Sequence, residues 1–568
     1  MPMNLLTDPW LPFRRSDGSL LYRPPSALAD PDILDLALPR ADFQGAAWQF
    51  LIALLQTAMT PKNTDAWLDR YQTPPSVEEL EAALAPFSRA FELDGEGPRF
   101  MQDLDPLGDV KDAPVAGLLI DSPGANGIKN NTDFFVKRGR VEAVCPDCAA
   151  LALYTMQINA PAGGAGIRVG LRGGGPLTTL ILPEDETKTL WERLWPNVMP
   201  ADAVGQPGQT WRPPTVDDAD LFFWMTDTRV SDKKGTEVFP DQVHPLHALW
   251  SMPRRYRLLF EDESGCCDLC GRECSRLVRR LRSKKQGANY DGPWSHPLTP
   301  YRRLNPKKTD ELPLSSKGQP GGLGYRHWPG LVLEDEAGSG AMPARVVTHH
   351  LHKYHMVEAA RDDGEAFDAM FRHARLWVFG YDMDNMKPRG WYSVEMPLVG
   401  VPEAHQEILR EWVKRFADLA SDVAWQVRNQ LKRAWFKRPE DAKGDMSQID
   451  AQFFEATQLA FFDVLRQMSE TLRDDGGTPA LSPEIHRQWY LTLKREALRL
   501  FDAQAISGPL EGMKMQQLER ITSARRYLLD YLNGSGKKIG KTVQAFAQVG
   551  GFELKAPQSE GNRKGNAA

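Results

Sequence analysis

The chain has 568 residues, a formal net charge of −6, and 42% hydrophobic and 25% charged residues. This length exceeds what one hydrophobic core usually serves, so we expect two or three domains, and the ordinary composition excludes a chain that is disordered throughout. The acidic balance excludes nucleic-acid binding through overall charge, so any such binding requires a local basic patch.

The amino-terminal region predicts neither a signal peptide nor a membrane span. Asp8 and Pro9 interrupt the chain before an apolar run develops. The most apolar window, AAWQFLIALLQTAM, is shorter than a bilayer requires and contains two glutamines, so it predicts a buried helix over 43–59, followed by an acidic helix over 75–92. We expect a cytoplasmic protein without membrane contact, in which clustered cysteines hold metal rather than form disulfides.

The hydrophobic pattern divides the chain into two regions. Residues 1–400 mix helix-like stretches, short strand-like runs and loops rich in glycine and proline, which predicts a mixed α/β domain. Residues 401–555 contain four amphipathic stretches, which predict an antiparallel four-helix bundle. We therefore expect an α+β fold with these two domains and a disordered tail over residues 556–568.

The helices of the predicted bundle are expected over residues 402–436, 447–474, 483–506 and 510–533. Apolar residues at helical spacing are typical of a packed core rather than of a cofactor site. The residues expected in this core are Leu409, Trp412, Val413, Phe416, Leu419 and Val423 of the first helix and Phe453, Phe454, Leu459, Phe462, Val464 and Leu465 of the second.

Two CxxC pairs predict a metal site in the first domain. They are CPDC, with Cys145 and Cys148, and CDLC, with Cys267 and Cys270. Two such turns place four thiolates around a tetrahedral ion, so we expect a structural zinc site; two unrelated thiol pairs are the alternative. A thioredoxin-like redox site is disfavoured because neither pair follows a strand and opens a helix in a βαβ unit.

Other suggestive patterns receive no assignment. Cys266 and Cys274 are left over from the CxxC spacing, and the histidine-rich run THHLHKYH at 348–355 is expected to form a surface helix. The segment GSGKKIGKT lacks the glycine that a Walker A loop requires five positions before Gly540. No histidine precedes His244, whereas a nucleobase deaminase needs one upstream of its PCxxC motif.

Basic residues concentrate after the second CxxC pair, which suits a polyanion groove on an otherwise acidic protein, although a solvated charged face is the alternative. Only Glu273 and Asp291 are acidic in this stretch. The basic residues are Arg272, Arg276, Arg279, Arg280, Arg282, Lys284, Lys285, Arg302, Arg303, Lys307 and Lys308.

Two loops add to this hypothesis. NNTDFFVKRGR places Phe134 and Phe135 beside basic residues, an arrangement that suits base stacking and phosphate contact, although a core phenylalanine pair is equally compatible. PAGGAGIRVGLRGGG is rich in glycine, which lets a backbone approach a ligand closely, although turns and bulges need glycine too. It contains no dinucleotide-binding fingerprint in a βα context.

The chain resembles the large subunit of the type I-E CRISPR Cascade surveillance complex, the CasA family. The resemblance runs from NLLTDPWLP through the CPDC pair, APAGGAGIRVGLRGGGPLTT, CDLCGR, GPWSHPLTPY and GYDMDNM into the helical region, and so covers nearly the whole chain. It implies a non-catalytic subunit that recognises a protospacer-adjacent motif in double-stranded DNA, starts strand separation for R-loop formation and helps recruit a helicase–nuclease.

The resemblance also assigns residues. The motif-reading glycine loop of the family matches Ala162, Gly163, Gly164, Ala165 and Gly166, and both alanines stand where a member of the family has glycine. The minor-groove lysine matches Lys285, and the strand-separating wedge matches Asp384 and Asn385, of which only Asn385 keeps an amide. The loop that touches the guide-RNA 5′ end and neighbouring subunits matches Phe135, Val136 and Lys137.

The implied partners are target DNA, the 5′ end of the CRISPR RNA, the other Cascade subunits and the helicase–nuclease. Two other hypotheses differ in kind. A scaffold that clamps DNA without reading a motif predicts no dependence of binding on the bases beside the guide-matched region. A scaffold that merely caps the complex also predicts that Lys285→Ala and Asn385→Ala leave DNA binding unchanged. If the chain is a zinc-dependent or nucleotide-hydrolysing enzyme, the lone subunit should show turnover. All-cysteine ligation and the incomplete Walker motif disfavour this hypothesis.

Overall fold

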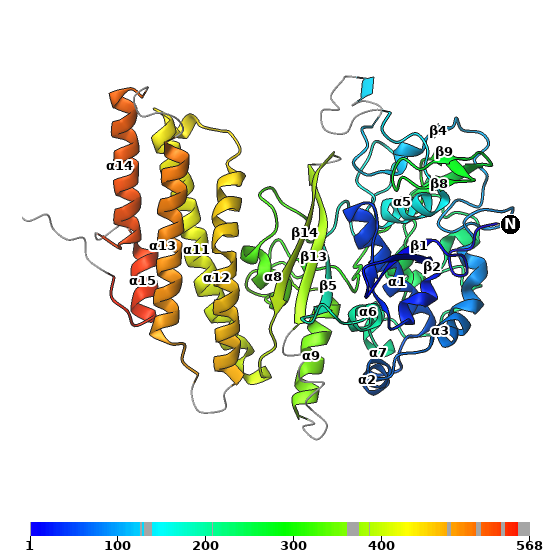
Figure 1. The fold of residues 1–568 in the computed structure, drawn as a ribbon, viewed down its shortest axis with the longest axis horizontal. Coiled ribbons are helices and arrows are strands. Elements are labelled where there is room, and N and C mark those ends of the chain that lie inside the picture. Colours follow the sequence, from blue (N-terminus) through cyan, green and yellow to red (C-terminus); the bar gives the residue numbers. More distant parts are fainter. Residues whose placement is uncertain are drawn as a thin grey trace, which may run out of the picture. The chain divides into compact units, whose positions relative to one another are not determined.

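The computed structural model describes residues 2–124, 128–129, 139–206, 208–359, 374–384, 387–473, 479–506, 513–535 and 540–554. Contacts divide the chain into two compact units: Met1–Gln319 with Gly330–Leu398, and Pro320–Pro329 with Val399–Ala568. The first unit mixes helices and strands, and the second is helical (Figure 1). The predicted α+β fold class is confirmed.

The first unit contains short strands in small antiparallel sheets. The strand orders are β2-β1-β3, β11-β10-β12, β14-β13-β5, β4-β9-β6 and β7-β8. The strands are β1 (Leu11–Arg15), β2 (Leu20–Arg23), β3 (Ile33–Leu36), β4 (Ala113–Pro114), β5 (Thr178–Pro183), β6 (Arg255–Glu261), β7 (Gly265–Cys266), β8 (Glu273–Cys274), β9 (Leu277–Lys284), β10 (Tyr301–Arg302), β11 (Leu314–Ser315), β12 (Ala341–Met342), β13 (Ala374–Asp384) and β14 (Lys387–Leu398).

Helices pack between and around these sheets. They are α1 (Ala41–Ala58), α2 (Thr64–Gln72), α3 (Val77–Leu84), α5 (Pro146–Asn159), α6 (Leu190–Leu194), α7 (Ala201–Val204), α8 (Trp328–Val332), whose first residues belong to the second unit, and α9 (Arg345–Ala359). Helix α1 is the predicted apolar helix, and it is buried along nearly its whole length. The acidic helix expected over 75–92 is α3 continued by a 3-10 helix.

The core of the first unit is a cluster of aromatic rings around α1. The Phe50 ring meets those of Phe91, Phe100, Tyr154 and Trp250 edge-on, with centroids 5.6–6.0 Å apart. Edge-to-face pairs add to the free energy of area burial because the positive ring edge faces the negative ring face. Since Tyr154 belongs to α5, this cluster fixes the helix that carries one CxxC pair.

Helix α9 differs from the surface helix expected for the histidine run. His350 and Lys353 are each only 1% exposed. The Lys353 ammonium lies 3.4 Å from the centroid of the Trp67 ring, a cation–π contact. The expected helix is present, and His352 is exposed on it, but its other face is buried in the first unit.

The second unit is built on α11 (Gln406–Trp435), α12 (Ser447–Arg473), α13 (Pro483–Ala505) and α14 (Met515–Leu532), which match the four predicted helices, and on the shorter α15 (Lys541–Val549). The core residues expected on α11 are all buried. On α12 the expectation was wrong at Leu459, which is 80% exposed, and at Phe462, which is only half-buried, because Phe461 occupies the buried position. The tail at 556–568 lies outside the described residues.

A segment from the middle of the chain completes this unit. Tyr325, from Pro320–Pro329, stacks on Phe461 with ring centroids 4.3 Å apart. Its hydroxyl lies 2.9 Å from the hydroxyl of Thr457, also on α12. Local sequence patterns give no sign of this contact, because the two segments are far apart in the chain.

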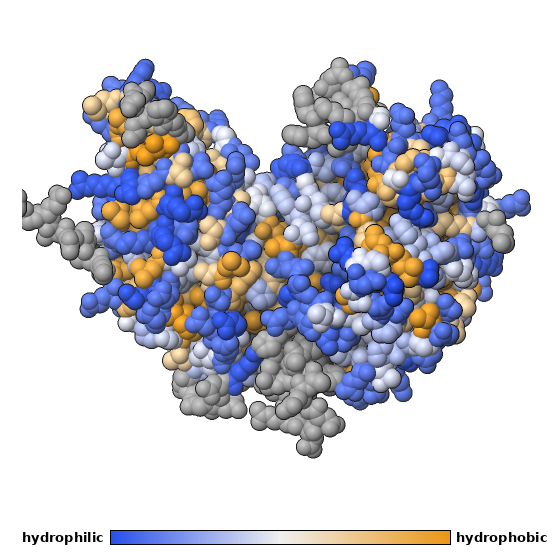
Figure 2. Space-filling view, in the orientation of Figure 1, coloured by the Kyte–Doolittle hydropathy of each residue, from blue (hydrophilic) through white to orange (hydrophobic). Residues whose placement is uncertain are grey.

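Hydrophilic residues cover most of the face shown in Figure 2, with hydrophobic ones in small scattered patches. In the part of the chain that the structure describes, no helix combines the length and the apolar character that crossing a membrane requires.

Candidate metal centre and DNA-reading site

Two turns bring four cysteine sulfurs together. Cys145 precedes α5, and its sulfur accepts a hydrogen bond from the Cys148 backbone N–H at 3.4 Å. The second turn is closed by a 2.8 Å hydrogen bond from the Gly271 N–H to the Cys267 carbonyl, and Gly271 has a φ of +74°, a conformation that favours glycine. The sulfurs of Cys145, Cys148, Cys267 and Cys270 all lie within 4.8 Å of one another.

Protein contacts hold the two turns in place around this cluster. The Asp268 carboxylate accepts hydrogen bonds from the backbone N–H groups of Glu142 and Ala143, at 2.7 and 2.8 Å. Arg272 forms an ion pair with Asp147 at 2.7 Å and covers the ring of Tyr22. Arg272 therefore joins the second turn to α5 and to β2.

The donor set fits a zinc ion. A hydrogen bond from the Cys145 thiol is the main cause that lowers the pKa of Cys267. A hydrogen bond from the Cys148 thiol is the main cause that lowers the pKa of Cys270 to about 7. The pKa of Cys148 is raised, chiefly by its contact with the Cys145 sulfur. Four sulfurs this close cannot all ionise without a cation between them, and zinc takes four thiolates in tetrahedral geometry. Four protein ligands would leave no open position on the metal.

The cluster connects directly to the basic segment. Val144, just before Cys145, exchanges backbone hydrogen bonds of 3.0 and 2.8 Å with Val278 on β9. Strand β9 then pairs with β6 up to Lys284. The position of the residues after Lys284 is thus tied to the cysteine cluster.

Most of the basic run is paired with acids, and nearly all of these acids lie elsewhere in the sequence. Each pair lowers the local positive potential, so along most of the run the pairing favours the alternative of a solvated charged face. The ion pairs are Arg272–Asp147, Arg276–Asp94, Arg279–Glu263, Arg280–Asp112, Arg282–Asp112, Lys284–Asp109, Arg303–Glu336 and Lys308–Glu311.

Three members of the run, Lys285, Arg302 and Lys307, form no ion pair with a described residue, and of these Lys285 meets another predicted element. Its side chain is exposed. A Cβ placed on Gly166, whose φ is +79°, would lie 3.4 Å from the Lys285 Cβ and 3.5 Å from its Cδ. The Gln286 N–H donates a 2.7 Å hydrogen bond to the Gly166 carbonyl. The structure thus places the lysine against the glycine loop.

The loop at residues 162–166 presents backbone to solvent. Ala162, Gly164 and Ala165 are exposed. A Cβ on Gly164 would meet no atom within 4 Å, and its carbonyl accepts a 2.9 Å hydrogen bond from the Ile167 N–H. The loop and Lys285 together therefore offer backbone polar groups and one free ammonium on one surface.

Sequence reasoning missed the residues that support this arrangement. Gln286 has a φ of +66°, which is uncommon for a residue other than glycine. Its carbonyl accepts a 3.0 Å hydrogen bond from the Ser231 N–H, and the Ser231 hydroxyl donates to the Gly287 carbonyl at 2.6 Å. Arg168 donates two 2.6 Å bonds to Ser231. Nothing in the local sequence marks these partners.

Arg172 was also missed, because its motif GLRGGG was interpreted through its glycines. Its side chain is buried and donates to the Thr178 and Thr299 hydroxyls, to the Gln49 amide oxygen and to the Ile158 carbonyl, at 3.0–3.2 Å. Burial lowers the pKa of Arg172 to about 10. The guanidinium joins α1, α5 and β5 beneath the glycine-rich segment.

Replacing Gly174 by alanine is expected to disturb the backbone of Pro161 and Ala162, where the glycine loop begins. The added Cβ would lie 2.9 Å from the Pro161 Cα and 3.2 Å from the Ala162 nitrogen, so backbone must move. We expect a loss of about 1–3 kcal/mol in the free energy of unfolding, measured by chemical denaturation. Gly117→Ala is the matched control, because a Cβ there meets no atom within 4 Å. Equal losses in the two variants would contradict the close approach.

The predicted wedge lies partly in the described chain. Asp384 is exposed at the end of β13, where it pairs in register with Lys387 of β14, and Asn385 lies outside the described residues. A Cβ on Gly175 would lie 2.5 Å from the Met383 side chain, so the glycine-rich segment adjoins this end of the hairpin. The structure therefore links the loop to the hairpin that carries Asp384.

The remaining assignments fall outside these contacts. Phe135, Val136 and Lys137 of the predicted guide-RNA loop lie outside the described residues. Cys266 is exposed, and the sulfurs of Cys266 and Cys274 lie 3.3 and 3.6 Å from the Gly271 and Arg272 carbonyls. Neither belongs to the group of four clustered cysteines.

Comparison with known proteins agrees with this architecture. CasA from Thermus thermophilus is 17% identical, with a TM-score of 0.67 over 94% of this chain and 100% of that chain. Cse1 from Acidimicrobium ferrooxidans is 15% identical, with a TM-score of 0.63 over 94% and 98%. A chain of a CRISPR RNA-guided surveillance complex is 16% identical, with a TM-score of 0.60 over 93% and 99%.

At these identities the structural matches establish a shared fold. Residues 4–500 also match the family model of the CRISPR-associated protein Cse1, which covers most of the chain and both CxxC pairs. The resemblance to CasA found in the sequence is thereby confirmed. The chain belongs to the CRISPR-associated Cse1 (CasA) family.

Proposed function

We propose that this chain is the non-catalytic, motif-reading subunit of a CRISPR RNA-guided surveillance complex in the cytoplasm. It recognises a protospacer-adjacent motif in double-stranded target DNA and starts strand separation for R-loop formation. One observation carries the proposal: Lys285 is exposed without an ion pair against Gly166, while most of the surrounding basic run is paired.

The chemistry of this surface suits the minor groove. That groove presents mainly acceptors, adenine N3 and thymine O2, with the guanine amino group as its one donor. An ammonium meets the acceptors, and loop carbonyls meet the guanine donor. Because the minor-groove pattern is degenerate, recognition of several related motifs is expected. The exposed Ala162 and Ala165 carry methyl groups that set how closely the backbone approaches a base edge.

The structural zinc site has a supporting role in this proposal. Zinc held by Cys145, Cys148, Cys267 and Cys270 would fix β9 and therefore Lys285. Four thiolate ligands fill its coordination, so it supplies no open site for chemistry. The ion's contribution is to join the two turns before DNA binds.

The other partners follow from the family. Phe135, Val136 and Lys137 contact the 5′ end of the CRISPR RNA and the adjoining Cascade subunits. The bound complex then helps to recruit a separate helicase–nuclease. Because R-loop formation is a near-balanced exchange of duplexes, protein contacts of a few kcal/mol are enough to bias it.

Replacing Asn385 by alanine is expected to separate strand opening from motif binding. An inserted side chain offsets a few kcal/mol of unstacking per base step, so its loss slows opening while initial duplex binding persists. Opening is followed by the fluorescence of 2-aminopurine placed beside the motif. Asp384→Asn adds an amide and removes a charge, so faster opening is expected. Unchanged opening in both variants would exclude this hairpin as the wedge.

The experiment that tests the proposal compares guide-loaded complexes with and without this chain. The DNA targets differ only in the bases beside the guide-matched region. Binding that requires the chain and depends on those bases supports motif reading. Binding that requires the chain but ignores those bases favours the clamping scaffold, and turnover of a nucleotide or base by the lone chain favours an enzyme.

A further inference from the structure

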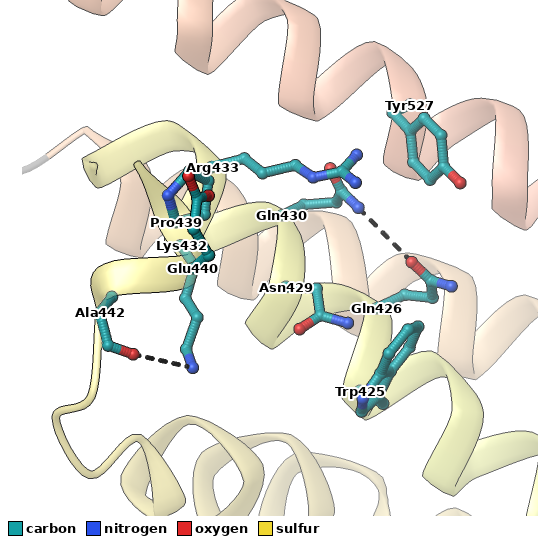
Figure 3. Close-up of a pocket in the computed structure, with 10 residues that line it drawn as sticks. All are labelled: Trp425, Gln426, Asn429, Gln430, Lys432, Arg433, Pro439, Glu440, Ala442 and Tyr527. Atoms are coloured by element: carbon teal, nitrogen blue, oxygen red, sulfur yellow. Dashed lines mark hydrogen bonds between the residues drawn. The ribbon is translucent and has the colours of Figure 1, made fainter. Parts of the chain in front are cut away.

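The helical unit carries a polar pocket of about 440 Å³ that is separate from the proposed DNA-reading residues (Figure 3). Most of its lining comes from one face of α11, where Trp425, Asn429 and Arg433 recur every four residues. Gln426 and Gln430 form a parallel row beside them. Tyr527 on α14 and a short segment after α11 complete the lining.

One of the two aromatic residues of the pocket, Trp425, is available for stacking. Trp425 is 50% exposed, whereas Trp412 and Trp489 are buried in the same unit. The Arg433 guanidinium lies 5.1 Å from the centroid of the Tyr527 ring, a cation–π contact that holds both side chains at the pocket. The exposed part of Trp425 therefore gives this polar pocket an aromatic face on which a flat ligand can stack.

Gln430 provides the second observation that points to a ligand. Its side chain is only 1% exposed, and its Oε1 has no hydrogen-bond partner among the described residues. The Gln430 amide nitrogen lies 3.5 Å from the Gln426 Oε1 (Figure 3). If the Gln430 amide were flipped, its nitrogen would take the unpaired position in place of its oxygen. Buried polar groups are nearly always paired, so this oxygen can accept a hydrogen bond from a ligand that displaces the side chains covering it.

The charged residues define the other end of the pocket. There the Lys432 side chain points toward Ala442, whereas the Arg433 guanidinium points toward Tyr527 (Figure 3). The Lys432 ammonium lies 3.4 Å from the Ala442 carbonyl, and Lys432, Arg433 and Glu440 form no ion pair within the described part of the chain. The lining therefore combines two cations with one carboxylate, which suits a monoanionic group better than a highly charged one.

We propose that this pocket binds one unpaired nucleotide. The base stacks on Trp425, an amino group on its edge donates to Gln430, and the phosphate lies near Arg433. Aromatic faces for stacking, amides for base edges and cations for phosphate are the usual combination at single-stranded nucleic-acid sites. The volume also lies in the range of nucleotide-sized ligand sites. The nucleotide is either free or part of a single strand.

This inference goes beyond the proposed motif reading. It uses neither Lys285 nor the glycine loop, and Tyr527 lies outside the residues 4–500 that match the family model. Failure of one proposal therefore leaves the other standing. The two tests also use different DNA: duplexes for motif reading, and unpaired probes for the pocket.

The test is isothermal titration of the full chain with adenosine 5′-monophosphate and with a single-stranded hexa-deoxyadenylate. Trp425→Ala is expected to weaken binding about fivefold or more, because it removes the stacking face. Phe436→Ala is the matched control, since Phe436 is an exposed aromatic just past the end of α11 that does not line the pocket. Trp425→Phe keeps an aromatic face and is expected to restore most of the affinity.

The contribution of the Arg433 charge is tested by the same titration. Arg433→Gln is expected to weaken binding severalfold, whereas Lys414→Gln, an equal charge change at an exposed site of α11 outside the pocket, leaves it unchanged. Tighter binding of the hexanucleotide than of the monophosphate indicates a strand, and equal binding indicates a free nucleotide. No binding of either probe at millimolar concentration, or equal effects of Trp425→Ala and Phe436→Ala, would overturn the proposal.

Discussion

Replacing Cys148 by serine is expected to abolish zinc binding and to destabilise the first unit strongly. Apparent binding free energies of zinc at four-ligand structural sites are on the order of 10 kcal/mol, and that energy becomes folding energy when the site joins distant segments. Here the cluster joins the turn before α5 to the turn before β8. Calorimetry should show the transition of the first unit at a much lower temperature, with that of the helical unit unchanged.

Cys266→Ser is the control for this experiment, since Cys266 is an exposed thiol next to a ligand but outside the cluster. It should keep one zinc ion per chain by elemental analysis and the original transition temperature. Chelation of the unsubstituted protein should reproduce the effect of Cys148→Ser. Equal zinc content in the two variants would refute the four-cysteine site.

Replacing Lys285 by alanine is expected to weaken target DNA binding about 5- to 150-fold, corresponding to about 1–3 kcal/mol for a lost base-edge contact. The free ammonium is the reason for the large effect, since no ion pair must be broken before it meets DNA. The slope of log K against log salt should also fall by about one. Binding is measured on the guide-loaded complex at several salt concentrations.

Lys284→Ala is the neighbouring control with the same change of charge. The Lys284 ammonium lies 2.7 Å from Asp109, so it is already neutralised by the protein. Its loss should weaken binding far less. If both variants weaken binding equally, the segment acts as a diffuse positive charge and not through a placed lysine.

Local sequence patterns predicted the parts of the structure that depend on local geometry. The spacing of Cys145 and Cys148, and of Cys267 and Cys270, indicates a ligand pair within each turn, and the structure brings the two pairs together. Helical periodicity gave the bundle helices within a few residues. It misplaced Leu459 because a buried stripe drifts around a long helix, and Phe461 satisfies the helical period better.

Long-range pairing explains what the sequence could not reveal. The basic run is neutralised by Asp94, Asp109 and Asp112, which are distant in the chain, so counting charges locally overestimates its potential. The neighbours Lys285 and Gly166 were connected beforehand only through the family resemblance. Their contact depends on backbone conformations, such as the positive φ of Gln286, that no residue type specifies.

The most direct test of motif reading is the ratio of dissociation constants for matched and base-substituted duplexes, measured with the guide-loaded complex. Complexes carrying the unsubstituted chain, Lys285→Ala and Lys284→Ala are compared at one salt concentration. The account predicts a large ratio for the unsubstituted chain and for Lys284→Ala, and a ratio that falls toward one for Lys285→Ala. A ratio that Lys285→Ala leaves unchanged would contradict the account, because the bases would then be read elsewhere.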